Sequence, residues 1–76
     1  MTIADLRPGE SGTVAHVGGE NALRLRLMDM GLIPGTTVEL ERTAPMGDPI
    51  QIRLRGYALA LRRVDAGKIL LRENSQ

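Results

Sequence analysis

The sequence predicts a mainly β fold, a small barrel of about five antiparallel strands with one short helix after the first strand. The chain has 76 residues, enough for one domain with a single core. Nine glycines and four prolines divide it into segments too short for long helices. Between these breaks apolar and polar residues alternate, as in strands with one buried face.

The composition indicates an aliphatic core and a weakly charged surface. Hydrophobic residues make up 42% of the chain, and Tyr57 is the only aromatic one. Ten basic and nine acidic residues leave a net charge of +1, so no strong field attracts phosphate backbones or anionic lipid. Proteins that bind single-stranded nucleic acid usually stack bases on several aromatic rings, which argues against that class.

Cysteine usage and hydropathy bear on the compartment. The absence of cysteine excludes disulfides, thiolate metal sites and thiol catalysis. The N-terminal residues lack the basic start and apolar stretch of a secretion signal. The longest apolar run, 57–61, is far shorter than the roughly 20 residues that span a bilayer. We therefore expect a cytoplasmic protein.

The first 20 residues predict an opening turn and one strand. Thr2 is placed to cap a short turn that carries Ile3. Pro8-Gly9 favours a type II turn, and a strand follows over 12–17. Small and apolar residues occur on both faces of this strand, so the alternation does not decide which face is buried.

The segment 21–30 fits two patterns. Its alternating leucines are typical of a strand, whereas Leu23, Leu27 and Met30 share one stripe of a helix. We predict the helix because signals flank it at both ends.

One signal marks the start of the predicted helix, and the others mark its end. Asn21 is placed to cap the first turn, and Gly31 can adopt the left-handed conformation that ends many helices. Leu32 then stands where a hydrophobic contact often closes such an ending, and Pro34 prevents continuation.

From residue 36 the pattern predicts a meander. Val38 and Leu40 face one way, and Glu39 and Glu41 face the other. The prolines within 44–49 remove backbone donors and fix φ, which predicts a rigid turn.

Two hairpins follow, and their loops set the pairing register. With 45–49 as the first loop, Leu40 faces Leu54 and Glu41 faces Arg53. With Arg55-Gly56 as the second loop, every inward residue meets an inward residue. The predicted pairs of this second hairpin are Leu54 with Tyr57, Ile52 with Leu59, and Ile50 with Leu61.

The C-terminal part predicts a brief turn and a last strand. Residues 62–67 suit the turn, with Val64 as its apolar anchor. Residues 68–72 form the strand, with Ile69 and Leu71 facing inward.

These elements predict an SH3-like β-barrel, closed or nearly closed. The domain is expected to cover residues 1–73, and the polar residues 74–76 to form a frayed tail.

Several short motifs resemble the FeoA family, the ferrous iron transport protein A group. Residue types and spacings both agree with the family, and the match runs over nearly the whole chain. The motifs are Arg26-Leu27, Gly31-Leu32-Ile33-Pro34-Gly35, Ala44-Pro45-Met46-Gly47-Asp48-Pro49-Ile50, Gly56 and Leu59-Ala60-Leu61-Arg62.

The resemblance implies a fold, a location and a partner. The fold is an SH3-like barrel related to the C-terminal domain of DtxR-type metal-dependent repressors. The location is the cytoplasm, and the partner is the ferrous iron transporter FeoB, whose cytoplasmic part includes a G-protein-like GTPase domain. Transition-metal handling follows only from the resemblance, because nothing in composition or periodicity indicates iron.

The helix and the turn after it are the expected docking surface. Leu25 and Met28 lie off the buried stripe, so a helix would expose them beside Arg24. Arg26 is expected to brace Asp48 or the Pro-Gly turn, with presentation to a partner as the alternative. The candidate partner-binding residues are Arg24, Leu25, Arg26, Met28, Leu32 and Pro34.

The remaining motif residues are expected to satisfy backbone geometry in turns. These structural residues are Gly31, Gly35, Pro45, Gly47, Asp48, Pro49 and Gly56.

No catalytic, metal or cofactor site is expected. His16 is the only histidine, whereas a metal site needs several converging ligands. Glu39 and Glu41 share a face with Arg53 and fit a solvated charge ladder. Gly67-Lys68 lacks the upstream glycine of a phosphate-binding loop.

The sequence therefore predicts a protein-interaction module and not an enzyme. The leading hypothesis is an accessory protein that binds and modulates a FeoB-like transporter. One alternative is a metal-responsive regulatory domain that works beside a repressor. A less favoured one is a small RNA-binding barrel that uses Arg53, Arg55, Arg62 and Arg63.

Overall fold

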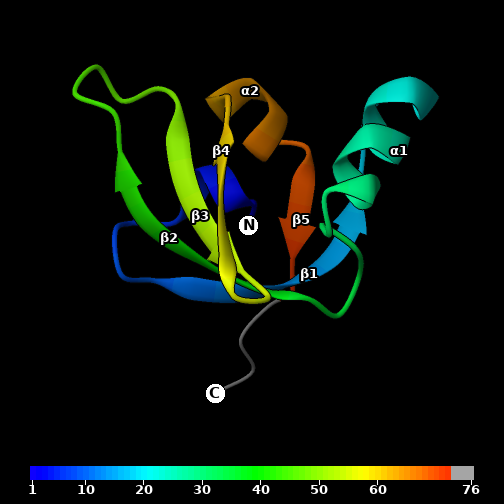
Figure 1. Cartoon of the computed structure of the whole chain (residues 1–76). Coiled ribbons are helices and arrows are strands. Elements are labelled where there is room, and N and C mark those ends of the chain that lie inside the picture. The colour runs from blue at the N-terminus through cyan, green and yellow to red at the C-terminus, as the bar shows by residue number, and fades with distance from the viewer. Residues whose placement is uncertain (73–76) are drawn as a thin grey trace.

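The computed structural model describes residues 1–72, so the predicted tail at 74–76 lies outside the described residues. Figure 1 shows the path of the chain. The elements are the 3-10 helix η1 (Ile3–Asp5), β1 (Ser11–Val17), α1 (Asn21–Asp29), β2 (Thr37–Thr43), β3 (Ile50–Leu54), β4 (Tyr57–Leu61), α2 (Arg63–Ala66) and β5 (Ile69–Leu71).

One antiparallel sheet carries the strands in the order β4-β3-β2-β1-β5 and curves around the core (Figure 1). The predicted strands and the helix after the first strand are confirmed. Within residues 1–72, β4 and β5 do not pair, so the barrel is open between them. The apolar core comprises Ile3, Leu6, Val14, Val17, Leu27, Leu32, Val38, Leu40, Ile50, Ile52, Leu54, Leu61, Ala66, Ile69 and Leu71.

A bulge in β1 explains why alternation did not identify the buried face. Val14 pairs with Leu71 and His16 with Leu70, so Ala15 is an extra residue on β1. The bulge turns both Val14 and Val17 into the core, although they are three positions apart.

Helix α1 ends as predicted. Gly31 has φ of 101°, and its N–H donates to the Met28 carbonyl at 2.9 Å. The Leu32 N–H donates to the Leu27 carbonyl at 3.2 Å, which completes a Schellman ending. The prediction that Asn21 caps the helix is wrong, because Glu20 holds the cap position and Asn21 is the first helical residue.

The register between β2 and β3 differs from the prediction. Leu40 pairs with Ile52 and Glu39 with Arg53, which is a shift of two residues. One residue of the shift comes from the loop, which spans 44–49 because Thr43 pairs with Ile50, and the other comes from Glu41, the extra residue of a second bulge. The predicted ion pair still forms diagonally, with Arg53 Nε 2.5 Å from Glu41 Oε2. Donation from Arg53 and then from Gln51 lowers the pKa of the Glu41 carboxyl.

The hairpin of β3 and β4 has the predicted register. Leu54 pairs with Tyr57 across a two-residue loop in which Arg55 has φ of 49° and Gly56 has φ of 86°. Two positive φ values are typical of a type I′ turn. The inward position predicted for Tyr57 is wrong, since this side chain is 42% exposed and donates its hydroxyl hydrogen to the Met30 carbonyl.

The segment after β4 is the short helix α2, where the sequence predicts a brief turn. Val64 is not its anchor, because the side chain is 61% exposed. Ala66 and Asp65 are buried instead, and Asp65 accepts from Arg62 at 3.2 Å. In β5, Ile69 and Leu71 face inward as predicted.

Arg63 joins three distant segments at the end of the barrel where α2 packs against η1. Its Nε donates to the Gly47 carbonyl and its Nη1 to the Ala4 carbonyl, both at 2.9 Å. The Arg63 backbone N–H also donates to Asp48 Oδ1 at 2.9 Å. This arginine clamp fixes the 44–49 loop and η1 against α2.

Replacing Gly31 by alanine will cost more stability than replacing Gly35. Both glycines have positive φ, so both alanines carry the left-handed penalty of about 1–2 kcal/mol. Of the two positions, only Gly31 has a side chain in the path of a new Cβ, which would lie 2.8 Å from the Tyr57 hydroxyl. Urea unfolding of both variants measures the difference. It should shrink when Tyr57→Phe removes the hydroxyl, and equal costs in the wild-type background would contradict this account.

Arg63→Met will destabilise the domain by about 2 kcal/mol, because two partly buried carbonyls lose charged donors. For a chain of this size that corresponds to a Tm about 8–16 °C lower. Arg42→Met is the matched control, since it removes only the hydrogen bonds of an exposed arginine to Gln51, at 3.3 and 3.4 Å. Calorimetry that finds equal Tm losses in the two variants would refute the clamp.

Arg53→Gln will raise the pKa of Glu41, because Arg53 is the largest cause of its lowering. Arg42→Gln will raise it less, since Arg42 acts only through weaker Coulomb attraction. Carboxyl ¹³C titration by NMR compares the two variants. As the folded-state pKa lies below the ordinary value of 4.5, the ionised pair stabilises the fold above that pH. This stabilisation is lost as the pH falls through the folded-state pKa.

Candidate functional site

The outer face of α1 presents an apolar side chain among arginines. Leu25 is 58% exposed, and Arg26 beside it is exposed as well. Arg24 is half-buried and lies 3.5 Å from the Asn21 side-chain oxygen that accepts from it. Pro34 is exposed in the turn after the helix.

Two predicted members of this surface are not on it. Met28 is half-buried and packs against the core, so the expectation that it is exposed is wrong. Leu32 is 0% exposed, because the Schellman ending turns it inward beneath the helix. We define the α1 surface as Arg24, Leu25, Arg26 and Pro34.

Arg26 does not brace Asp48, contrary to the expectation from the sequence. The Asp48 carboxylate accepts from the Arg63 backbone instead. Among the described residues, Arg26 forms neither an ion pair nor a side-chain hydrogen bond. Its charge is therefore available at the surface.

The arginines that suggested an RNA strip are engaged within the molecule. Arg53 pairs with Glu41, and Arg62 pairs with Asp65. Arg55 donates one hydrogen to Thr36 Oγ1 at 3.2 Å. The two ion pairs reduce the positive charge that a phosphate backbone would meet, whereas Arg55 and Arg63 keep theirs because their acceptors are neutral.

The carboxylates and the histidine do not form a reactive cluster. His16 is exposed on β1, and Glu41 is held in its ion pair with Arg53. Over residues 1–72 no three His, Asp or Glu side chains converge on a point where they could hold a metal ion. In the same part of the chain, every helix is too short or too polar to cross a bilayer.

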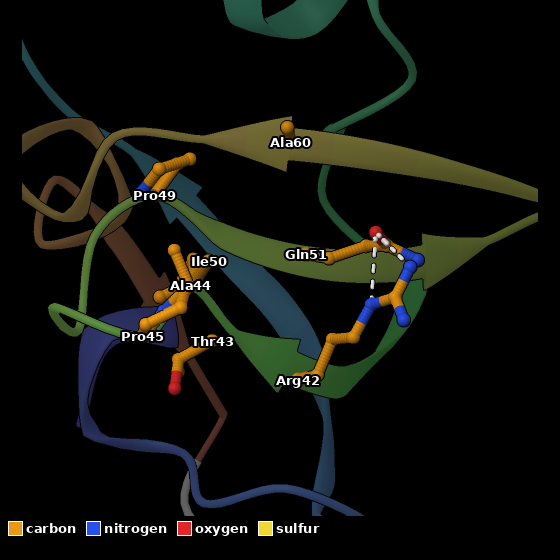
Figure 2. Close-up of a pocket in the computed structure, with 8 residues that line it drawn as sticks. All are labelled: Arg42, Thr43, Ala44, Pro45, Pro49, Ile50, Gln51 and Ala60. Atoms are coloured by element: carbon orange, nitrogen blue, oxygen red, sulfur yellow. Dashed lines mark hydrogen bonds between the residues drawn. The ribbon is translucent and has the colours of Figure 1, made fainter.

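The sequence did not reveal a pocket of about 410 Å³ beside the 44–49 loop. Figure 2 shows Pro45 and Ile50 on one side, and Arg42 bonded to Gln51 on the other, at 3.3 and 3.4 Å. Its lining combines apolar and neutral polar side chains with Arg42. The lining residues are Arg42, Thr43, Ala44, Pro45, Pro49, Ile50, Gln51 and Ala60.

Met46 belongs to the same loop but does not line the pocket. Met46 is 93% exposed at the tip of the loop. Two backbone hydrogen bonds across the loop fix its shape: Gly47 N–H donates to the Ala44 carbonyl at 2.7 Å, and Ala44 N–H to the Pro49 carbonyl at 2.9 Å.

Solved structures share this fold. The FeoA protein of Chlorobium tepidum is 39% identical with a TM-score of 0.87, covering 93% of this chain and 68% of that one. The zinc-complexed FeoA of Stenotrophomonas maltophilia, described as an SH3 domain protein, is 25% identical with a TM-score of 0.82, covering 95% of this chain and 89% of that one. A manganese-dependent transcriptional repressor at 15% identity shares the fold alone, with a TM-score of 0.83 over 93% of this chain and 40% of the repressor.

Sequence comparison points to the same family. A Porphyromonas gingivalis protein, a fusion of Fe(2+) transport protein A with the Fe(2+) transporter FeoB, is 35% identical over 69 residues. That match covers 91% of this chain but only 8% of the fusion protein. The FeoA domain model matches residues 1–73. The chain therefore belongs to the FeoA family, a group of non-enzymatic accessory domains of ferrous iron transport with an SH3-like fold.

Proposed function

We propose that this chain is a cytoplasmic accessory protein of ferrous iron uptake that binds a FeoB-like transporter and modulates it. The observation that carries the proposal is the fusion of a 35% identical chain to FeoB in P. gingivalis. Fusion holds two chains at a high effective concentration, which is useful where they act together.

The α1 surface is the proposed contact with the transporter. Leu25 supplies exposed apolar area, and the unpaired Arg26 supplies a charge next to it. Arginine is enriched at protein interfaces, and a partner can bury the apolar area of Leu25 beside it. The Schellman ending at Gly31 and the hydrogen bond from Tyr57 to Met30 hold this helix on the barrel.

Modulation requires the chain to distinguish two states of the transporter. A partner that binds both states equally shifts neither population. The domain offers no reactive cluster over residues 1–72, so binding energy is the means by which it can act. Contact with the GTPase domain or with the membrane-domain face would allow the chain to distinguish the two states.

Leu25→Asp will weaken binding to the purified full-length transporter in detergent at least about tenfold, because it places a carboxylate in an apolar contact. The matched control is Val64→Asp, which alters a side chain of similar exposure, 61% against 58%, on α2. Calorimetric titration of both variants gives the two affinities. Equal weakening would move the contact away from α1, and no binding of the wild type would overturn the proposed function.

A further inference from the structure

The two edges of the sheet are treated differently. β5 has only three residues, and its outer side is occupied by the N-terminus. Thr2 bridges Leu70 there, and the Leu71 N–H donates to the Met1 carbonyl at 2.8 Å. β4 pairs with β3 over five consecutive residues without a bulge, and within residues 1–72 no strand lies on its other side.

β4 also lacks the devices that usually protect an edge. Its sequence is Tyr-Ala-Leu-Ala-Leu, with no charge, no proline and no irregularity. Natural edge strands commonly carry one of these to prevent pairing with another chain. An uncharged, regular edge is therefore a place where an added strand can bind.

The hairpin geometry identifies the free backbone groups. Leu54 and Tyr57 flank a type I′ turn, so they form a hydrogen-bonded pair, and such pairs alternate along an antiparallel ladder. Ala58 and Ala60 fall at the non-bonded positions, and their N–H and C=O groups point away from β3. Both alanines are exposed, and neither takes part in the backbone bonds formed outside the ladders of residues 1–72.

The pocket beside the 44–49 loop adjoins this edge. Ala60 belongs to both, forming one wall of the pocket from β4 (Figure 2). Its small side chain leaves room for a neighbouring residue on an added strand to reach over it, toward Pro49 and Ala44. An added strand could therefore pair with the backbone of β4 and at the same time place a side chain in the pocket.

Charge identifies the occupant. Residues 49–64 contain four arginines and no acidic residue. Arg55 and Arg62 flank β4 and are exposed. Arg55 donates only to the neutral Thr36 hydroxyl, so its charge is unpaired, whereas Arg62 shares its charge with Asp65 through one nitrogen. In an antiparallel pairing with a second copy centred on Leu59, Gly56 would lie opposite Arg62 of the other copy. This places Arg55 beside that arginine, and the repulsion between like charges disfavours self-association.

We propose that the open edge of β4 receives an extended segment of another protein by strand addition. The segment alternates apolar and polar residues, carries acidic residues at its ends, and places an apolar side chain in the pocket beside Ala60. This surface is separate from the α1 surface. The loss of either therefore leaves the other proposal standing.

The test is an NMR titration of the ¹⁵N-labelled chain. The probe is an acetylated, amidated peptide with a Thr-Val-Thr-Val-Thr centre and two aspartates at each end, and the comparison peptide has lysines in place of the aspartates. We expect the acidic peptide to shift the Ala58 and Ala60 amides and to slow their hydrogen exchange. The lysine peptide should bind at least about tenfold more weakly, because it meets Arg55 and Arg62.

Two pairs of variants connect this binding to the edge. Ala60→Pro removes only an outward N–H and puts a ring in the path of the added strand, so affinity should fall about tenfold or more. Ala60→Ser keeps the N–H and should bind within about twofold of wild type. Arg55→Glu should weaken the acidic peptide and strengthen the lysine peptide, whereas Arg55→Gln should only weaken the acidic one, and neither alters β4 itself.

Three results would overturn the proposal. One is an absence of shifts at Ala58 and Ala60 with either peptide, or shifts confined to α1. Another is equal affinity for the two peptides in every variant. The third is protection of both amides without peptide in a sample that sediments as a dimer, which would assign the edge to a second copy of the chain.

Discussion

The fold depends on covering the ends of an aliphatic core, because the curved sheet surrounds this core only at its sides. The sheet buries leucine, isoleucine and valine side chains, each worth about 1.5–3 kcal/mol when fully removed from water. Without large aromatic rings, this core needs covers at its ends. Arg63 provides one by bonding two backbone carbonyls that lie far apart in the chain, at Ala4 and Gly47. One side chain thus fixes η1, α2 and the 44–49 loop together.

Two bulges shape the sheet around that core. Each inserts one residue, Ala15 in β1 and Glu41 in β2, and a bulge bends its strand and increases its twist. The bulge at Glu41 also changes which residues meet. Together with the 44–49 loop it makes Glu39 the direct partner of Arg53, yet the Glu41 carboxylate stays close enough to accept from Arg53.

The apolar core fills the inside of so small a barrel, so a partner can bind only to its outer surface. The two proposed binding surfaces differ in chemistry: α1 offers an apolar side chain framed by positive charge, and β4 offers backbone groups beside a pocket. Tyr57 lies between them, as it belongs to β4 and donates to the carbonyl of Met30 at the end of α1. This hydrogen bond links the edge strand directly to the end of the helix that carries the α1 surface.

The sequence by itself determined what depends on near neighbours. The strand periods, the two-residue loop at Arg55-Gly56 and the helix ending at Gly31 are local, so the β3–β4 register and the Schellman ending followed from them. The exposed Leu25 followed from helical periodicity in the same way. Family motifs extended these local signals to the whole fold.

Only the tertiary structure decided where the chain departs from regular period or bonds across long separations. An inserted bulge residue leaves no mark in a polar strand, so the β2–β3 register could not be predicted at Glu41. The sequence could not show that Arg63 forms the clamp while Val64 beside it is exposed. The partners of Arg63 lie 59 and 16 residues away in the chain. The pocket and the open edge at Ala60 arise from segments that meet only in space, and alternation along one strand carries no information about what lies beside it.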